Sequence, residues 1–140
     1  MGMMRVLVVD DDIVDRMAVL RGFSRAGLEA EFQVASDGLE ALEILRSVGH
    51  GADGGNPFLV LLDLNMPRMS GIPFLEELRK DPGLKRTVVF VLTTSDRDED
   101  RLAAYDQFIA GYILKADAGR NFENLIKLLT AYWNVVVLPS

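Results

Sequence analysis

The stretch that decides the fold is Phe58-Leu59-Val60-Leu61-Leu62-Asp63, a continuous apolar run that ends in a carboxylate. Because apolar and polar residues do not alternate in this run, a strand formed from it is buried on both faces, as in a parallel sheet with helices on each side. Four further apolar runs recur along the chain: Val6–Val9, Phe32–Ala35, Val88–Leu92 and Tyr112–Leu114. We expect these runs to form the strands of one sheet.

A segment with helical spacing of apolar residues follows each run. In residues 119–133, for example, Phe122, Leu125 and Leu129 fall on one face of a helix. The other segments of this kind are residues 13–26, 37–48, 70–80 and 97–108. The alternation of strand and helix predicts an α/β fold, with a five-stranded parallel sheet, right-handed crossovers and helices on both faces.

Composition limits the class of protein. The chain has 140 residues, 49% of them hydrophobic, which suits one domain with a real core. The net charge of −6 argues against a nucleic-acid partner, because Lys and Arg hold phosphate backbones. The lack of cysteine excludes disulfides and Cys-ligated zinc. No stretch approaches the roughly 18 apolar residues that span a bilayer. We therefore expect a soluble, cytoplasmic protein with no membrane partner.

One Gly-rich segment, residues 49–57, interrupts the pattern before the third strand. A phosphate-binding loop is the alternative reading, but such a loop opens a helix with Gly-Lys-Ser/Thr, whereas this segment lacks that signature and precedes a strand. The segment contains His50, the only histidine, in no helical setting of the kind that a kinase phosphohistidine has. We expect a connecting loop with a solvated His50.

Polar side chains that can bind ions or take part in reactions stand at the ends of four of the runs. They are Asp10 and Asp11, Asp63, Thr93, and Lys115. Any one of these acids, taken singly, is more simply a helix cap. Together they predict a site, because ligands of an open parallel sheet bind beyond the carboxyl ends of its strands. Three carboxylates there repel one another unless a hard cation such as Mg²⁺, which prefers oxygen ligands, lies between them.

The chemistry of such a site follows from its groups. Asp63 supplies a carboxylate nucleophile, whose attack on a phosphoryl group gives an aspartyl phosphate. A Mg²⁺ held by Asp11 and Asp63, with support from Asp10, neutralises the phosphoryl oxygens. Lys115 adds a second positive charge, and the hydroxyl of Thr93 donates to a phosphoryl oxygen. The sequence therefore predicts phosphoryl transfer to Asp63.

The chain resembles response-regulator receiver domains over almost its whole length. The motifs that carry the resemblance are Val8-Val9-Asp10-Asp11, Leu61-Leu62-Asp63-Leu64-Asn65-Met66-Pro67-Arg68-Met69-Ser70-Gly71, Val91-Leu92-Thr93-Thr94-Ser95 and Gly111-Tyr112-Ile113-Leu114-Lys115. The resemblance implies the flavodoxin-like fold of that family, with strand order 2-1-3-4-5. One position departs from the pattern: the family usually has a proline after the lysine, and here Ala116 follows, which bears on the aim of Lys115.

The resemblance also implies roles for individual residues. Asp63 is the phosphoacceptor, Asp10 and Asp11 are the metal-binding pair, and Asn65 ligates Mg²⁺ through its backbone carbonyl.

Two further expectations concern the switch and the access of water. The resemblance implies that Thr93 and Tyr112 move together on phosphorylation, although residue type alone makes Tyr112 an ordinary core residue. Asn65 and Ser95 border the site, and we expect them to control how easily water reaches the phosphoryl group.

The C-terminal stretch, residues 131–140, is similar to the ending of single-domain regulators that partner bacterial phytochromes. This similarity implies a receiver domain over residues 1–133, a C-terminal extension over residues 134–140 and no output domain. It also implies a sensor histidine kinase of the phytochrome type as the partner. The apolar tail from Val135 to Leu138 either folds back on its own chain or, as we expect, helps to form a homodimer with the fourth helix, fifth strand and fifth helix.

Three other functions fit parts of the pattern. A phosphohydrolase that works through an aspartyl phosphate needs an Asp two residues after its nucleophile, where this chain has Asn65. A flavodoxin-like cofactor carrier needs a hydroxyl-rich phosphate loop after the first strand, where Asp10-Asp11-Asp12 repels a phosphate. A degenerate receiver that only binds partners has no need of the complete set of site residues. We therefore expect a switch whose only chemistry is self-phosphorylation and self-dephosphorylation, not a turnover enzyme.

Overall fold

A computed structural model describes residues 3–48 and 57–139 of the chain. Most of the Gly-rich segment, including His50, falls in residues 49–56 and so outside the described residues, and the expectations for it stay predictions. None of the helices in residues 3–48 and 57–139 has the length and apolarity needed to cross a lipid bilayer.

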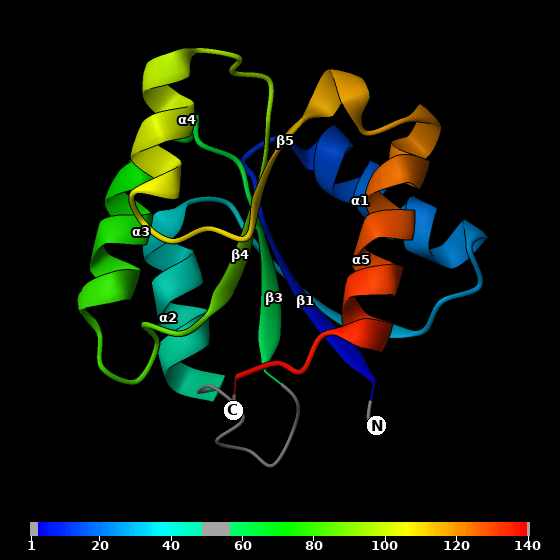
Figure 1. The fold of residues 1–140 in the computed structure, drawn as a ribbon, viewed down its shortest axis with the longest axis horizontal. Helices are drawn as coiled ribbons and strands as arrows, with labels where there is room; N and C mark the ends of the chain where they lie inside the picture. Colours follow the sequence, from blue (N-terminus) through cyan, green and yellow to red (C-terminus); the bar gives the residue numbers. More distant parts are fainter. Residues whose placement is uncertain (1–2, 49–56, 140) are drawn as a thin grey trace.

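Five parallel strands form one sheet in the order β2-β1-β3-β4-β5, which confirms the predicted topology (Figure 1). Their bounds are β1 Met4–Val9, β2 Ala30–Ala35, β3 Phe58–Leu62, β4 Val88–Thr93 and β5 Gly111–Leu114. Strands β1 and β3 are buried along their whole length, because helices cover both faces of the sheet at its centre, and this explains their unbroken apolar sequence. Strand β5 lies at an edge and is only half-buried.

Helices cover both faces of the sheet. Their bounds are α1 Ile13–Arg25, α2 Gly38–Val48, α3 Gly71–Lys80, α4 Asp98–Tyr105 and α5 Glu123–Val135, with two 3₁₀ turns, η1 Lys115–Asp117 and η2 Arg120–Phe122. Helices α1 and α5 lie side by side on one face, and α2, α3 and α4 lie on the other (Figure 1). Each face has its own apolar core, one around Phe23, Leu125 and Leu129 and the other around Phe74, Leu75 and Leu78.

The ends of α4 and α5 differ from the predicted ones by two residues or more. Helix α4 ends at Tyr105 and not at residue 108, because Phe108 has a φ of 59°, which a right-handed helix does not allow. Helix α5 begins at Glu123 and not at residue 119, because Asn121 and Phe122 have φ values of 53° and 58°. Helix α5 also continues to Val135, two residues past the expected end of the domain. Apolar spacing cannot reveal a left-handed residue, so it places the end of a helix beyond such a residue.

Arg79 at the end of α3 joins three segments of the chain. Its Nε donates to the carbonyl of Gln107 at 2.7 Å, and its Nη2 donates to the carbonyl of Phe108 at 3.0 Å. Its Nη1 donates to the carbonyls of Lys85 and Thr87, each at 2.8 Å. One guanidinium thus satisfies carbonyls of the turn before β4 and of the turn before β5. Both turns set the direction in which these strands enter the sheet.

We predict that Arg79→Met lowers the free energy of unfolding by about 3 kcal/mol, because the carbonyls it leaves lose a charged donor while the apolar stem is kept. Urea denaturation followed by circular dichroism measures the change. Lys80→Met is the matched control, since Lys80 is exposed and has only a loose 3.8 Å ion pair with Glu77; it changes stability by less than about 0.5 kcal/mol. Equal midpoints for the two variants contradict this role of Arg79.

Candidate functional site

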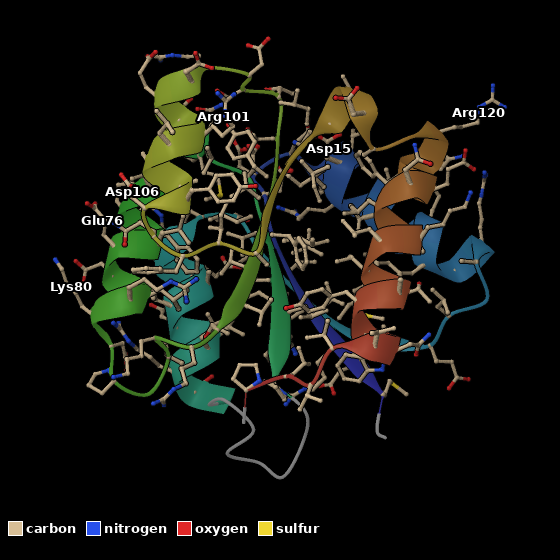
Figure 2. All side chains as sticks on the ribbon, in the orientation of Figure 1. Asp15, Glu76, Lys80, Arg101, Asp106 and Arg120 are labelled. Carbon is tan, nitrogen blue, oxygen red and sulfur yellow. The ribbon has the colours of Figure 1, made fainter. Side chains whose placement is uncertain are left out.

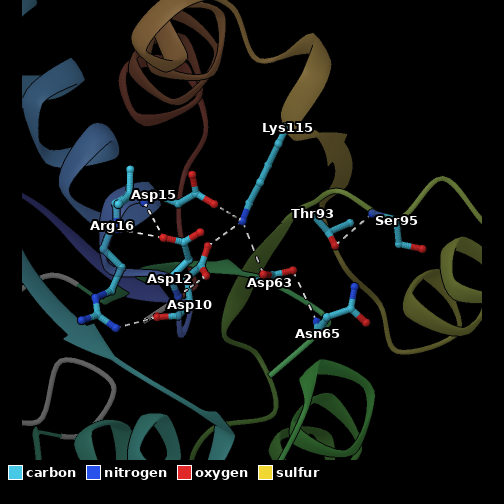
Figure 3. Close-up of polar contacts among 10 residues, drawn as sticks. Asp10, Asp12, Asp15, Arg16, Asp63, Asn65, Thr93, Ser95 and Lys115 are labelled. Carbon is cyan, nitrogen blue, oxygen red and sulfur yellow. Dashed lines mark hydrogen bonds and ion pairs between the residues drawn. The ribbon is translucent and has the colours of Figure 1, made fainter. Parts of the chain in front are cut away.

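The carboxyl ends of four parallel strands meet at one edge of the sheet. Strand pairing continues one residue past the strands, because the Asp63 amide donates to the Val9 carbonyl at 2.9 Å and the Asp10 amide donates to the Ala35 carbonyl at 3.0 Å. Asp10 after β1 and Asp63 after β3 are therefore fixed side by side. Lys115 follows β5, and its side chain points toward both acids (Figure 3). The register of the sheet thus positions the site.

The structure brings Asp10, Asp11 and Asp63 together. One carboxylate oxygen of each lies within 4.8 Å of the others. Asp10 and Asp63 are buried, with exposed fractions of 4% and 7%, whereas Asp11 faces solvent. Burial raises the pKa of the Asp10 carboxyl, and the hydrogen bond from Lys115 acts in the opposite direction. Three hard oxygen donors, two of them withdrawn from water, fit a divalent cation that enters from the open side at Asp11.

Lys115 is the positive group among these acids. Its Nζ donates to Oδ2 of Asp10 at 2.8 Å, to Oδ2 of Asp15 at 2.6 Å and to Oδ2 of Asp63 at 3.4 Å. Burial by itself lowers the pKa of this amine, but the hydrogen bonds to Asp10 and Asp15 outweigh that effect and raise the pKa above its usual value. Lys115 is therefore protonated. Ala116 in place of the usual proline lies in η1 and leaves the lysine directed into the site.

Asp15 is a member of the site that the sequence analysis missed. It lies in the first turn of α1, where Asp12 caps the helix by accepting hydrogen bonds from the amides of Val14 and Asp15 at 2.9 and 3.3 Å. An acid in a first helical turn is common, so it attracts no attention by itself. No spacing marks it in the sequence either, because Asp11 lies before the cap Asp12 and outside the helix that carries Asp15.

The carboxylates of Asp10 and Asp63 are held to different degrees. Asp10 accepts from the Asp12 amide at 2.9 Å and from Lys115 at 2.8 Å. Asp63 accepts from the Asn65 amide at 3.3 Å and from Lys115 at 3.4 Å. Asp10 is thus firmly fixed, while Asp63 is central and buried but has only long contacts. Of the two, Asp63 is the carboxylate that can form a new bond with the smaller loss of existing ones.

Thr93 and Tyr112 are linked through Ser95. Thr93 is fully buried at the end of β4, and its Oγ1 accepts from the Ser95 amide at 3.3 Å. The Tyr112 hydroxyl donates to the Ser95 carbonyl at 2.8 Å, and its ring packs against the core under α2, α3 and α4. Ser95 lies on the side of Thr93 away from Asp63 (Figure 3). A shift of Thr93 toward Asp63 therefore acts on the segment that holds Tyr112.

The loop after Asp63 is held in place by one backbone contact and one side-chain contact. The Gly71 amide donates to the Leu64 carbonyl at 3.0 Å, and a Cβ at Gly71 would lie 2.7 Å from the Cα of Leu64, so only glycine fits. Arg68 donates from its Nε to Oδ2 of the buried Asp37 at 2.6 Å, which lowers the pKa of Asp37. These contacts hold Asn65 beside Asp63, with the Asn65 side chain exposed at the mouth of the site.

The chain matches known proteins over nearly its whole length. The family model of the response regulator receiver domain covers residues 6–127. The response regulator Rcp1 of Synechocystis sp. is 33% identical over 96% of this chain and 92% of its own length. The Mn²⁺-bound structure of Rcp1 superposes with a TM-score of 0.81 at 30% identity, over 98% of this chain and 99% of that one.

Two other similar structures are those of a phytochrome response regulator and of a response regulator in red light signaling. The phosphorylated cyanobacterial phytochrome response regulator RcpA has a TM-score of 0.84 and 33% identity, and the match covers 99% of this chain and 100% of RcpA. RPA3017, a response regulator in red light signaling of R. palustris, has a TM-score of 0.83 and 30% identity over 99% of both chains. Sequence, fold and the arrangement of acids around Lys115 agree: this chain belongs to the family of response regulator receiver domains.

Proposed function

We propose that this chain is a stand-alone response regulator that accepts a phosphoryl group on Asp63 from a partner sensor histidine kinase of the phytochrome type, in the cytoplasm. The names of Rcp1, RcpA and RPA3017 as response regulators, two of them tied to phytochrome or red light, support the signalling role and the type of kinase. The match to 92% of the length of Rcp1 supports a receiver domain as the body of this chain.

The observation that carries the proposal is that Asp63 is buried and central but accepts only long hydrogen bonds, from Asn65 and Lys115. In the step that follows from it, a carboxylate oxygen of Asp63 attacks phosphorus, an O–P bond forms, and the P–N bond to the kinase histidine breaks. The electron pair of that bond stays on the imidazole nitrogen. No proton has to leave Asp63, because the nucleophile is already a carboxylate, so this step needs no general base in the site.

The acids fit Mg²⁺ as the cofactor. Asp10, Asp11 and Asp63, with the backbone carbonyl of Asn65, are the residues that would hold it, and the Mn²⁺-bound form of Rcp1 supports a divalent ion. When bound, the ion neutralises charge on the transferring phosphoryl group. Lys115 supplies a second positive charge beside Asp63, and it can do so by exchanging its contact with a carboxylate for a contact with a phosphoryl oxygen.

The remaining residues transmit and time the signal. Thr93 donates its hydroxyl to the phosphoryl group, and the link through Ser95 then lets Tyr112 follow. Asn65 and Ser95 border the site and control the access of water, which sets the lifetime of the acyl phosphate. Because Asn65 occupies the position where a phosphohydrolase has its acid, the chemistry is limited to self-phosphorylation and self-dephosphorylation.

We predict that Asp63→Asn abolishes labelling by acetyl phosphate in the presence of Mg²⁺, since an amide oxygen is not a competent nucleophile. Asp11→Ala reduces the rate of labelling by at least about tenfold through loss of a metal ligand, a loss of about 1.4 kcal/mol. Intact-protein mass spectrometry measures both. Asp11 is exposed, so its removal leaves the core intact. The control is Asp98→Ala, which removes an exposed acid of α4 and keeps full labelling. Robust labelling of Asp63→Asn refutes the proposal.

Asp15 competes with the phosphoryl group for Lys115, because its 2.6 Å contact is shorter than the 3.4 Å contact to Asp63. We predict that Asp15→Asn speeds labelling by acetyl phosphate about threefold, as expected for a weakened charged hydrogen bond. The test is a double-mutant cycle. In a Lys115→Met background, which labels slowly, Asp15→Asn changes nothing further. An equal acceleration in both backgrounds shows that Asp15 acts by another route.

We also propose a homodimer through the face of α4, β5 and α5 together with the C-terminal tail. Leu102 and Tyr105 on α4 are exposed, and Phe108 is 79% exposed in the turn after it. The tail folds back in one part and stays exposed in another. Leu138 packs back on the core under α1 and α5, while Val135 and Val137 are 80% and 94% exposed. Two nearly bare valines at the end of α5 and in the tail, together with the exposed apolar side chains of α4, support an apolar interface.

We predict that a chain stopped after Trp133 dimerises at least about tenfold more weakly than the full chain, because it lacks these valines. Sedimentation equilibrium measures the dissociation constant. The full-length variant Val135→Ser with Val137→Ser gives the same result without loss of Leu138, so it separates the interface from the packing of the tail. Unchanged dimerisation in both, or a monomeric full chain, rejects the interface.

A further inference from the structure

A groove lies between α1 and α5, remote from the acidic site. It has a volume of about 640 Å³ and is lined by the second half of α1, by η2 and by successive turns of α5. This volume falls within the range of sites for small organic ligands, about 300–1,000 Å³. The two helices lie side by side on one face of the sheet (Figure 1), and the groove runs along their outer seam. The proposed phosphoryl chemistry uses none of its residues.

The floor of the groove is apolar and its rim is basic. Buried Gly22 and Ile126 and half-buried Leu28 form part of the floor. Arg25 and Lys127 are exposed on its walls. Arg120 projects from the outer side of the molecule at the end of the groove (Figure 2). The two kinds of surface together suit a ligand that is apolar at one end and charged at the other.

These three cations have no acidic ion-pair partner in the part of the chain that the structure describes. Among residues 3–48 and 57–139, the arginines at positions 5, 46, 68, 97 and 101 each form an ion pair with a carboxylate. Arg25, Arg120 and Lys127 form none within the same residues, although Glu123 also lines the groove. In a chain with a net charge of −6, three uncompensated cations around one groove give it a local charge opposite to that of the molecule.

The backbone at one wall of the groove is held in a strained shape. Asn121 and Phe122 are consecutive non-glycine residues with left-handed φ values of 53° and 58°. Gly22 of α1 packs directly against them, since a Cβ there would lie 2.7 Å from the Asn121 carbonyl oxygen. Left-handed residues in succession are unfavourable and persist where the surroundings impose them, often at ligand sites. The groove is thus preformed by close packing of α1 against η2.

We propose that this groove binds a small anionic amphiphile. Its carboxylate or phosphate group lies among Arg25, Arg120 and Lys127, and its apolar body lies on Ile126 and Leu28. The charge of the rim favours an anion, and the apolar floor favours a body that a bare phosphate or a purely acidic peptide lacks. The groove is a second binding site, distinct from the acids around Lys115.

The dye 1-anilinonaphthalene-8-sulfonate tests the proposal, because it has one anionic group on an apolar body. Its fluorescence on titration with the full chain gives one saturable site. The variant Arg120→Glu with Lys127→Glu weakens binding at least tenfold. The matched control is Lys85→Glu with Arg86→Glu, which makes the same change of charge at the other basic hollow, the one beside Phe108, and it binds as the unchanged chain does. If the control variant alone loses dye binding, or if both variants lose it equally, the proposal is overturned.

Ligand chemistry is tested on the same signal. Decanoate displaces the dye. Decanol, which lacks the charge, binds at least tenfold more weakly than decanoate, and the uncharged N-phenyl-1-naphthylamine binds at least tenfold more weakly than the anionic dye. Equal binding of the uncharged compounds overturns the role of the cations, and displacement by hexaglutamate at the concentration of decanoate shows an acidic-peptide site instead. Labelling by acetyl phosphate stays unchanged in both variant pairs. Failure of dye binding is therefore distinguishable from failure of phosphorylation at Asp63.

Discussion

The contact between the Lys115 ammonium and the carboxylates of Asp10, Asp15 and Asp63 is the interaction on which the site depends. Acidic groups this close are held together only where a positive charge lies among them, because burial removes the water that otherwise screens their repulsion. One lysine has three donors, and here each finds an oxygen. A single positive charge still leaves the cluster negative, so the site has both the affinity for a divalent cation and the lysine needed beside a phosphoryl group.

This arrangement requires the sheet to be built in one particular order. Asp10 and Asp63 become neighbours because β1 and β3 pair directly, while Lys115 reaches them from β5 across the end of β4. Contacts at both ends of the strands support this geometry: Gly71 fixes the loop after β3 beside Asp63, and Arg79 fixes the turns that precede β4 and β5. Arg79, at the far end of the sheet, thus serves the geometry of the acids without touching them.

The sequence is informative about this fold wherever a pattern has one physical cause. The structure confirms a strand at each of the five apolar runs, with Phe58–Leu62 at the expected bounds, and the continuous runs of β1, β3 and β4 are the buried ones. The acids at the strand ends come together for the same reason, since parallel strands end on one side. What the pattern misses depends on tertiary contact. The left-handed Asn121 is imposed by packing against α1, and the role of Asp15 becomes visible only when Lys115, 100 residues away, lies beside it.

The position of β5 at the edge of the sheet bears on the proposed route by which a change at Asp63 reaches the surface. Strand β5 pairs only with β4 among the described strands and is half-buried, so moving its side chains disturbs fewer contacts than moving those of β1 or β3. It carries Tyr112 and leads into Lys115, and its single neighbour β4 carries Thr93. Thr93 and Tyr112, the groups of the proposed switch, therefore lie on an edge strand and on its neighbour. In the proposed switch a change at Asp63 is expressed on the face at β5, because Thr93 and Tyr112 lie there, and not at β2 on the opposite edge.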